Sequence, residues 1–262
     1  MAPSITVSLD ATLAQRGIAV VFVLASGQVC ASAAQTCAAN WERAQADLKA
    51  ISRPEKIFTH PHLQGYKDLH AGLGLDLGVA ASMRGQLERE LKLAVPQNRE
   101  RPLTPSPESL IQILLRDGAL RTLGTIVDLY NTVALTHLIS AGAHDADKLG
   151  KNVALTMNTG EIDFRPLGQK KKQRLPLNEY SYTTDEHRAI CRLECKQANE
   201  TKLRPETSRW LFILQGNANI SLDKLDLARQ NLTDALAASI SELKLSCATL
   251  DSTKLNGSLM LA

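Results

Sequence analysis

The residues best suited to chemistry fall in the segment Ile126–Leu149, IVDLYNTVALTHLISAGAHDADKL. Asp128 and Asn131 stand three residues apart, a spacing that places both polar groups on one side of a helix. A run of small residues, Ser-Ala-Gly-Ala, comes next, and His144 and Asp145 follow it. Small residues let a ligand approach the backbone, and carboxylates offer hydrogen-bond acceptors. The segment predicts a polar pocket where a helix passes into a turn; a capped helix followed by a polar turn is the alternative.

Other candidate chemistry is weaker. The sequence has no Walker loop, no G-x-G-x-x-G, no H-E-x-x-H and no G-x-S-x-G elbow. His60 and His62 could bind a metal, but no third ligand follows at a useful spacing, and a catalytic zinc site needs three. Cys191 and Cys195 would share one face of a strand, where half-buried structural thiols are favoured over a nucleophile. We therefore expect neither a metal nor a cofactor.

Composition sets the protein class. The 262 residues are 44% hydrophobic and 22% charged, as in soluble globular proteins. The net charge of +3 permits contact with nucleic acid without demanding it. There are five cysteines and no CxxC pair, no secretory signal pattern and no apolar stretch of membrane-spanning length. We expect a cytoplasmic protein with reduced thiols and no membrane contact.

Apolar patterns predict the elements around the pocket. Ile18–Leu24 (IAVVFVL) is a continuous apolar run, typical of a strand buried on both faces. Two further strands of the same sheet are expected at Val153–Met157 and Trp210–Leu214, the former forming a hairpin with Glu161–Pro166. Helical periodicity marks further segments. These are Asp10–Arg16, Gln35–Ile51, Tyr66–Leu73, a helix capped by Ser106 and stopped near Gly118, the helix from Ile126, and a last helix from Ser221 with its stripe reaching Leu243.

These elements indicate an α/β (α+β) protein with a mixed sheet flanked by helices. Residues 1–250 are expected to form one domain despite the polar, proline-rich segment Pro96–Pro107, and residues 251–262 a loose tail. Ser52–Gly65 is predicted to be a loop. A short basic run is either a solvated loop or a patch that contacts RNA phosphates. It comprises Lys170, Lys171, Lys172 and Arg174.

The run PSPESLIQILLRDGALRTLGTIVDLYNTVALTHLISAGAHDADKL resembles the core of the B3/B4 domain of the phenylalanyl-tRNA synthetase beta subunit. There a D-x-x-N helix precedes a small-residue turn and an H-A-F-D segment. Asp128 and Asn131 match the first pair, and Ala143, His144 and Asp145 fall on A-F-D. GEIDFRPLG, AICRLECKQANETKL and TSRWLFILQGN extend the resemblance, which spans about residues 66–245 and is closer still to free-standing B3/B4 proteins.

The resemblance implies a B3/B4 editing-domain-like fold and a function. In the synthetase this domain hydrolyses tyrosyl-tRNA that was made in error. A free-standing aminoacyl-tRNA deacylase acting in trans on tRNA is therefore expected; a non-catalytic module that binds tRNA or an amino acid is the alternative. The synthetase histidine falls on Gly142, and its glycine-rich segment is replaced by CKQANETKL, where Glu200 is the available acid. A different amino-acid preference follows, while the oligomeric state stays open.

An aminoacyl ester is already activated, so an editing site has mainly to hold the substrate and place a water molecule. His144 could act as a base near neutral pH, or be a structural turn residue. The expected catalytic residues are Asn131, His144, Glu200 and Thr201. The expected substrate-binding residues are Asp128, Ala141, Gly142, Ala143 and Asp145.

Overall fold

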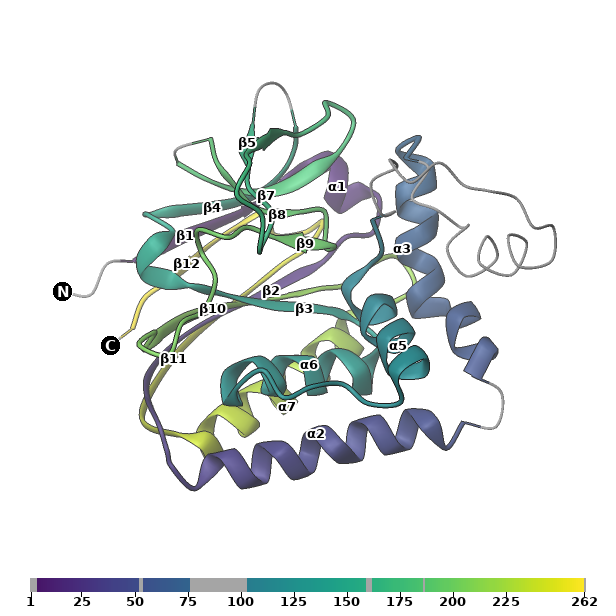
Figure 1. Cartoon of the computed structure of the whole chain (residues 1–262). Coiled ribbons are helices and arrows are strands. Elements are labelled where there is room, and N and C mark those ends of the chain that lie inside the picture. The colour runs from purple at the N-terminus through teal and green to yellow at the C-terminus, as the bar shows by residue number, and fades with distance from the viewer. Residues whose placement is uncertain (1–3, 52–53, 76–102, 159–161, 186, 262) are drawn as a thin grey trace.

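The computed structural model describes residues 4–51, 54–75, 103–158, 162–185 and 187–261. Two sheets stack on each other, and a layer of helices covers the outer face of the second sheet (Figure 1). The prediction of a mixed sheet flanked by helices is confirmed, because one neighbouring strand pair of the first sheet is parallel and the rest are antiparallel.

Within the described residues the first sheet has six strands in the order β12-β1-β4-β7-β8-β9. Their bounds are β12 (Asn256–Leu259), β1 (Ile5–Leu9), β4 (Asn152–Met157), β7 (Tyr180–Thr184), β8 (Ala189–Arg192) and β9 (Lys196–Gln197). The second sheet has the order β11-β2-β10-β3. Its strands are β11 (Ile240–Leu250), β2 (Val20–Val29), β10 (Arg209–Gln215) and β3 (Ser140–Asp145). A separate small pair joins β5 (Asp163–Phe164) to β6 (Gln173–Arg174).

The apolar sequence of β2 is explained by the burial of both faces of this strand. Successive strand residues face opposite sides of a sheet. Val20, Phe22 and Leu24 lie in the core between the two sheets, whereas Val21 and Val23 lie in the core beneath the helices. All five are fully buried. The prediction of a strand buried on both faces is confirmed, and each such side chain contributes roughly 1.5–3 kcal/mol.

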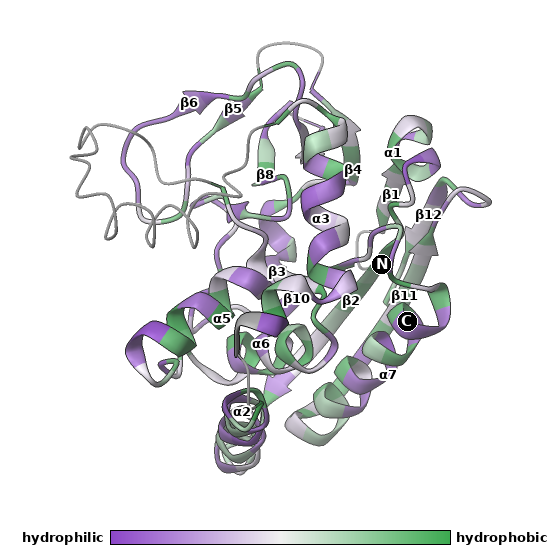
Figure 2. Ribbon diagram, turned by 90° about the vertical axis from the view of Figure 1, so that its right-hand side faces the viewer, coloured by the Kyte–Doolittle hydropathy of each residue, from purple (hydrophilic) through white to green (hydrophobic). Residues whose placement is uncertain are grey.

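The helices are amphipathic, as the mixed green and purple of their ribbons shows (Figure 2). Ile126, Leu129 and Val133 of α6 pack into this same core, which lies between the helices and the second sheet. Gly118 ends α5 with φ 77°, a left-handed conformation that glycine adopts readily. The helices are α1 (Ala11–Gln15), α2 (Ala33–Lys49), α3 (Pro61–Gly72), α5 (Ser106–Asp117), α6 (Thr125–His137) and α7 (Leu222–Ser239), with 3₁₀ turns η1 (Pro54–Thr59) and η2 (Ala146–Lys148).

Several local predictions are wrong because long-range strand pairing overrides local pattern. The small residues expected to form a turn instead form β3, which pairs along its length with β10. β4 pairs with β1 and β7 rather than with Glu161–Pro166, and it belongs to a different sheet from β2 and β10. The last helix ends at Ser239, and Leu243 lies in β11, which pairs with β2.

Three further segments also differ from expectation. The expected loose tail contains β12, whose residues pair antiparallel with β1 and bury Leu259 completely. The expected loop Ser52–Gly65 contains η1 and the first turns of α3. Pro105, not Ser106, occupies the cap position of α5.

Residues 96–102 of the expected linker lie outside the described residues. The single domain over residues 1–250 stays a prediction. Among the described residues, no helix combines the length and apolar character needed to cross a membrane.

Candidate functional site

A cavity of about 210 Å³ lies between α5, α6, β3 and the segment from β8 to β9. Pockets for drug-sized ligands are larger, from about 300 Å³ upward. The size therefore suits a group as small as a single amino acid. Ser106 of α5 and Ser140 of β3 meet at its wall, their hydroxyl oxygens 2.9 Å apart.

Four of the predicted site residues line this cavity: Asn131, Ala141, Gly142 and His144. Gly142 and His144 are two apart in β3, so both face the same side of the strand. A Cβ placed on Gly142 would meet no atom within 4 Å. The Asn131 side chain is buried and has no hydrogen bond to any other described residue, so its amide is available to a ligand.

The remaining predicted residues do not line the cavity. Ala143 points the opposite way in β3, into the core beneath the helices. Asp128 accepts a hydrogen bond from the Leu123 backbone at 2.9 Å, and burial raises its pKa despite the backbone hydrogen bonds it receives. Asp145 caps η2, and Glu200 pairs with Arg165 at 2.8 Å. The prediction that these four residues lie in the pocket is therefore wrong, because each of them contacts another part of the protein instead.

Thr201 lies behind His144, not opposite it. Its hydroxyl is 2.8 Å from His144 Nδ1, and the residue is fully buried. Gln197 Nε2 donates to the Ala143 carbonyl at 2.7 Å and lies 3.3 Å from the same Nδ1. An amide nitrogen can only donate, so Nδ1 is the acceptor and Nε2 carries the ring proton. Nε2–H is thus the polar group of the ring left for a ligand.

His144 is not a base poised near neutrality, and that prediction is wrong. Burial lowers the pKa of His144 from 6.5 to about 3. The residue is neutral at physiological pH and acts as a hydrogen-bond donor.

The lowered pKa of His144 predicts that the stability of the protein depends on pH. Below pH 6.5 the unfolded chain binds a proton on His144 that the folded protein does not bind. Protonation therefore favours unfolding, and the contribution of His144 to the free energy of unfolding is lost as pH falls from 6.5 towards 3. At pH 4.5, two units lower, the loss is roughly 2–3 kcal/mol. Urea unfolding of wild type and His144→Asn at pH 7 and pH 4.5 measures it. Asparagine keeps an acceptor for Thr201 without titrating, so equal losses in both proteins would contradict the assignment.

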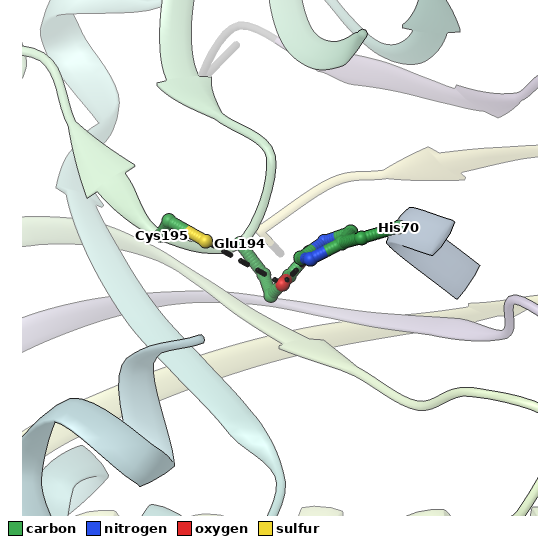
Figure 3. A group of neighbouring side chains, drawn as sticks. All are labelled: His70, Glu194 and Cys195. Carbon is green, nitrogen blue, oxygen red and sulfur yellow. Dashed lines mark hydrogen bonds and ion pairs between the residues drawn. The ribbon is translucent and has the colours of Figure 1, made fainter. Parts of the chain in front are cut away.

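A buried polar network beside the cavity was not predicted. Glu194, which lines the cavity, accepts from His70 Nε2 at 2.9 Å through Oε1 and from the Tyr180 hydroxyl through Oε2. Gln215 Nε2 lies 3.4 Å from Oε2. Burial opposes the charge, but His70 and the hydrogen bonds from His70 and Tyr180 lower the pKa of Glu194 overall. Glu194 is therefore held as a carboxylate, and its carboxyl group lies between His70 and Cys195 (Figure 3).

The two thiols near Glu194 are not activated. Cys195 Sγ donates to Glu194 Oε1 at 3.6 Å, and Cys191 Sγ donates to the Leu193 carbonyl at 3.2 Å. Burial and the charge of Glu194 raise the pKa of both thiols. Cys195 follows the end of β8, so the pair does not share one strand face as expected. Both line the cavity as neutral thiols, unsuited to nucleophilic attack without a metal.

The other sequence candidates lie elsewhere. His60 Nδ1 accepts from the His62 backbone at 3.2 Å as the cap of α3, and His62 Nδ1 is 2.9 Å from the His137 carbonyl. Hydrogen bonds within the protein therefore hold both imidazole rings in place. None of the four basic-run residues lines the cavity, and Lys172 pairs with Asp163 at 3.2 Å.

A family model described as the B3/4 domain matches residues 99–256, more than half of the chain. The chain belongs to the B3/4 domain family. The family expected from the sequence resemblance is thereby confirmed. The match includes α5, α6, β3 and the β8–β9 segment, which are the elements that enclose the cavity.

Among solved structures, this B3/4 protein is similar to an N-terminal fragment of the phenylalanyl-tRNA synthetase beta subunit from Pyrococcus horikoshii. The two are 18% identical with a TM-score of 0.38; the similarity covers 43% of this chain and 39% of that one. The chain thus spans about two fifths of that fragment. A search of curated proteins finds no match.

Proposed function

We propose that this B3/4 protein is a free-standing deacylase that hydrolyses the ester of mischarged aminoacyl-tRNA in trans. The observation that supports it most is the cavity itself. Asn131 brings an amide without an internal partner among the described residues, His144 brings an Nε2–H donor, and Gly142 leaves the space between strand and ligand open. Membership of the B3/4 family adds to this support.

The proposed chemistry needs hydrogen-bond donors more than a strong base. Attack of water on the ester carbonyl puts negative charge on the carbonyl oxygen, and fixed donors stabilise that charge. In this proposal the Asn131 amide and His144 Nε2–H are those donors. The paired hydroxyls of Ser106 and Ser140 orient the attacking water. Lys196, which also lines the cavity, faces the phosphates at the RNA end.

The test is a deacylation assay over a panel of mischarged tRNAs. If Asn131 stabilises the oxyanion, Asn131→Ala should lower the rate about 100-fold or more, since such a donor contributes on the order of 3 kcal/mol. Thr132→Ala is the matched control: the neighbouring hydroxyl bonds to the Asp128 carbonyl within α6 and does not line the cavity. An Asn131→Ala protein as active as this control would refute the assignment.

The alternative is a module that binds tRNA or an amino acid without hydrolysing it. Gly142 in place of the synthetase histidine, and the low basicity of His144, favour it. Saturable binding of aminoacyl-tRNA with no release of amino acid from any member of the panel would select this function.

The proposed deacylase must contact tRNA, and the basic run is the candidate site for that contact. Replacing Lys170, Lys171, Lys172 and Arg174 with alanine should weaken tRNA binding and flatten its salt dependence. The log–log slope should fall by about 0.7–0.9 for each phosphate that is no longer neutralised. Asp163→Asn should act oppositely because it frees Lys172 from its ion pair. Unchanged binding of the alanine variant at low salt would identify the run as a solvated loop.

A further inference from the structure

We propose that His70, Glu194 and Cys195 bind a divalent metal ion of the zinc class at the inner wall of the cavity. His70 comes from α3, and the other two from the segment between β8 and β9 (Figure 3). One nitrogen, one oxygen and one sulfur ligand atom lie within 4.8 Å of one another. This donor set is typical of zinc, and three protein ligands are the usual number in its open sites.

Two of the three ligand spacings are close to those of a coordination shell, and the third pair, His70 and Cys195, lies within 4.8 Å. Glu194 Oε1 is 2.9 Å from His70 Nε2 and 3.6 Å from Cys195 Sγ. In a tetrahedral zinc site the corresponding separations are about 3.3 Å and about 3.5 Å, from the usual ligand bond lengths. An ion would therefore enter with side-chain shifts of a few tenths of an ångström at these two atom pairs.

The surroundings fix the carboxylate so that one oxygen points at the other two ligands. Oε2 of Glu194 receives the Tyr180 hydroxyl and lies within reach of the Gln215 amide. Gln215 is itself held by the Tyr182 hydroxyl at 2.7 Å. Hydrogen bonds of this kind orient the ligands of a metal and strengthen its binding.

Charge balance favours the same conclusion. When the ion binds, Cys195 Sγ and His70 Nε2 lose their protons to solvent, and the coordinated imidazole carries its proton on Nδ1, which has no hydrogen-bond partner among the described residues. The thiolate and the Glu194 carboxylate then supply two negative charges against the two positive charges of the ion. The metal-bound cluster is therefore neutral, so the ion adds no uncompensated charge to the protein interior.

Glu194 and Cys195 line the cavity, so the ion would be reached from the cavity and water could be its fourth ligand. His60 and His62, the sequence candidates for a metal, take no part. The proposal does not depend on deacylase activity, since it concerns binding alone.

The test titrates EDTA-treated protein with Zn²⁺ by calorimetry and with Co²⁺ by absorption spectroscopy. The expected result is one ion per chain and a thiolate-to-cobalt charge-transfer band. Cys195→Ser should remove the band and weaken Zn²⁺ binding at least about 100-fold. Cys191→Ser is the matched control, because this thiol also lines the cavity but is outside the ligand set. The charge-transfer band and the zinc affinity should both persist in this variant.

Three outcomes would overturn the proposal: no stoichiometric binding of either ion, binding unchanged by Cys195→Ser, or binding abolished by Cys191→Ser. The first would leave the cluster as a buried ion pair only. Thermal melting of each variant in EDTA shows whether it is folded. If Cys195→Ser is unfolded, His70→Gln replaces it with the same expected loss of zinc affinity.

Discussion

Replacing Gly142 with tryptophan is expected to abolish the proposed deacylation while the protein stays folded. The glycine Cβ position faces open space in the cavity, with no atom within 4 Å, and Gly142 has no positive φ that would strain a side chain. An indole at this position would occupy most of a cavity of about 210 Å³. The substrate would be excluded without burial of an unpaired charge.

Gly142→Ala is the matched control for this experiment. A methyl group fits the same open space, so the alanine variant should keep most of the wild-type rate. Circular dichroism and thermal melting establish that both variants are folded. A folded Gly142→Trp protein that hydrolyses mischarged tRNA at the wild-type rate would place the active site elsewhere in the molecule.

Replacing Glu194 with glutamine should lower the free energy of unfolding by about 3–5 kcal/mol, the usual cost of breaking a buried ion pair. Both Glu194 and His70 are almost completely buried. An amide group adds a donor on one side of the side chain. That donor would face either His70 Nε2–H and the Cys195 thiol, or the Tyr180 hydroxyl and the Gln215 amide.

The measurement is urea unfolding in EDTA at neutral pH, with Glu200→Gln as the control. Glu200 also pairs with an arginine, but that pair is partly exposed and should contribute no more than about 1 kcal/mol. The lowered pKa of Glu194 means that its contribution is present above pH 4.5 and is lost as pH falls below that value. Equal losses for the two variants would show that the Glu194 network is not a main source of stability.

Local pattern was enough to predict the main helices and the buried strand β2, whereas the family came from the resemblance to known sequences. IAVVFVL predicts β2 because a strand covered on both faces needs apolar residues at every position. The three-to-four-residue spacing in α6 likewise reports one buried face. Asn131 and Gly142 were placed in a common pocket because one helix and the residues soon after it supply both.

Only the tertiary structure revealed the rest. Ser140–Asp145 has the small residues of a turn, yet it is a strand because β10 offers it a continuous set of backbone partners. β12 is ordered by pairing with β1, at the other end of the chain. Such pairings leave no local periodicity from which they could be predicted.

The acid beside the pocket illustrates the same limit. The sequence predicts Glu200 for the site because it is the acid in the segment that replaces a family motif, but Glu200 pairs with Arg165 outside the cavity. Glu194 sits between apolar and thiol residues with nothing nearby in sequence to mark it. Its partner His70 arrives from α3, far away along the chain. The sequence predicted the amphipathic helices and the buried strand β2, whereas the packing of α3 against the β8–β9 segment decided which charged groups meet at the cavity.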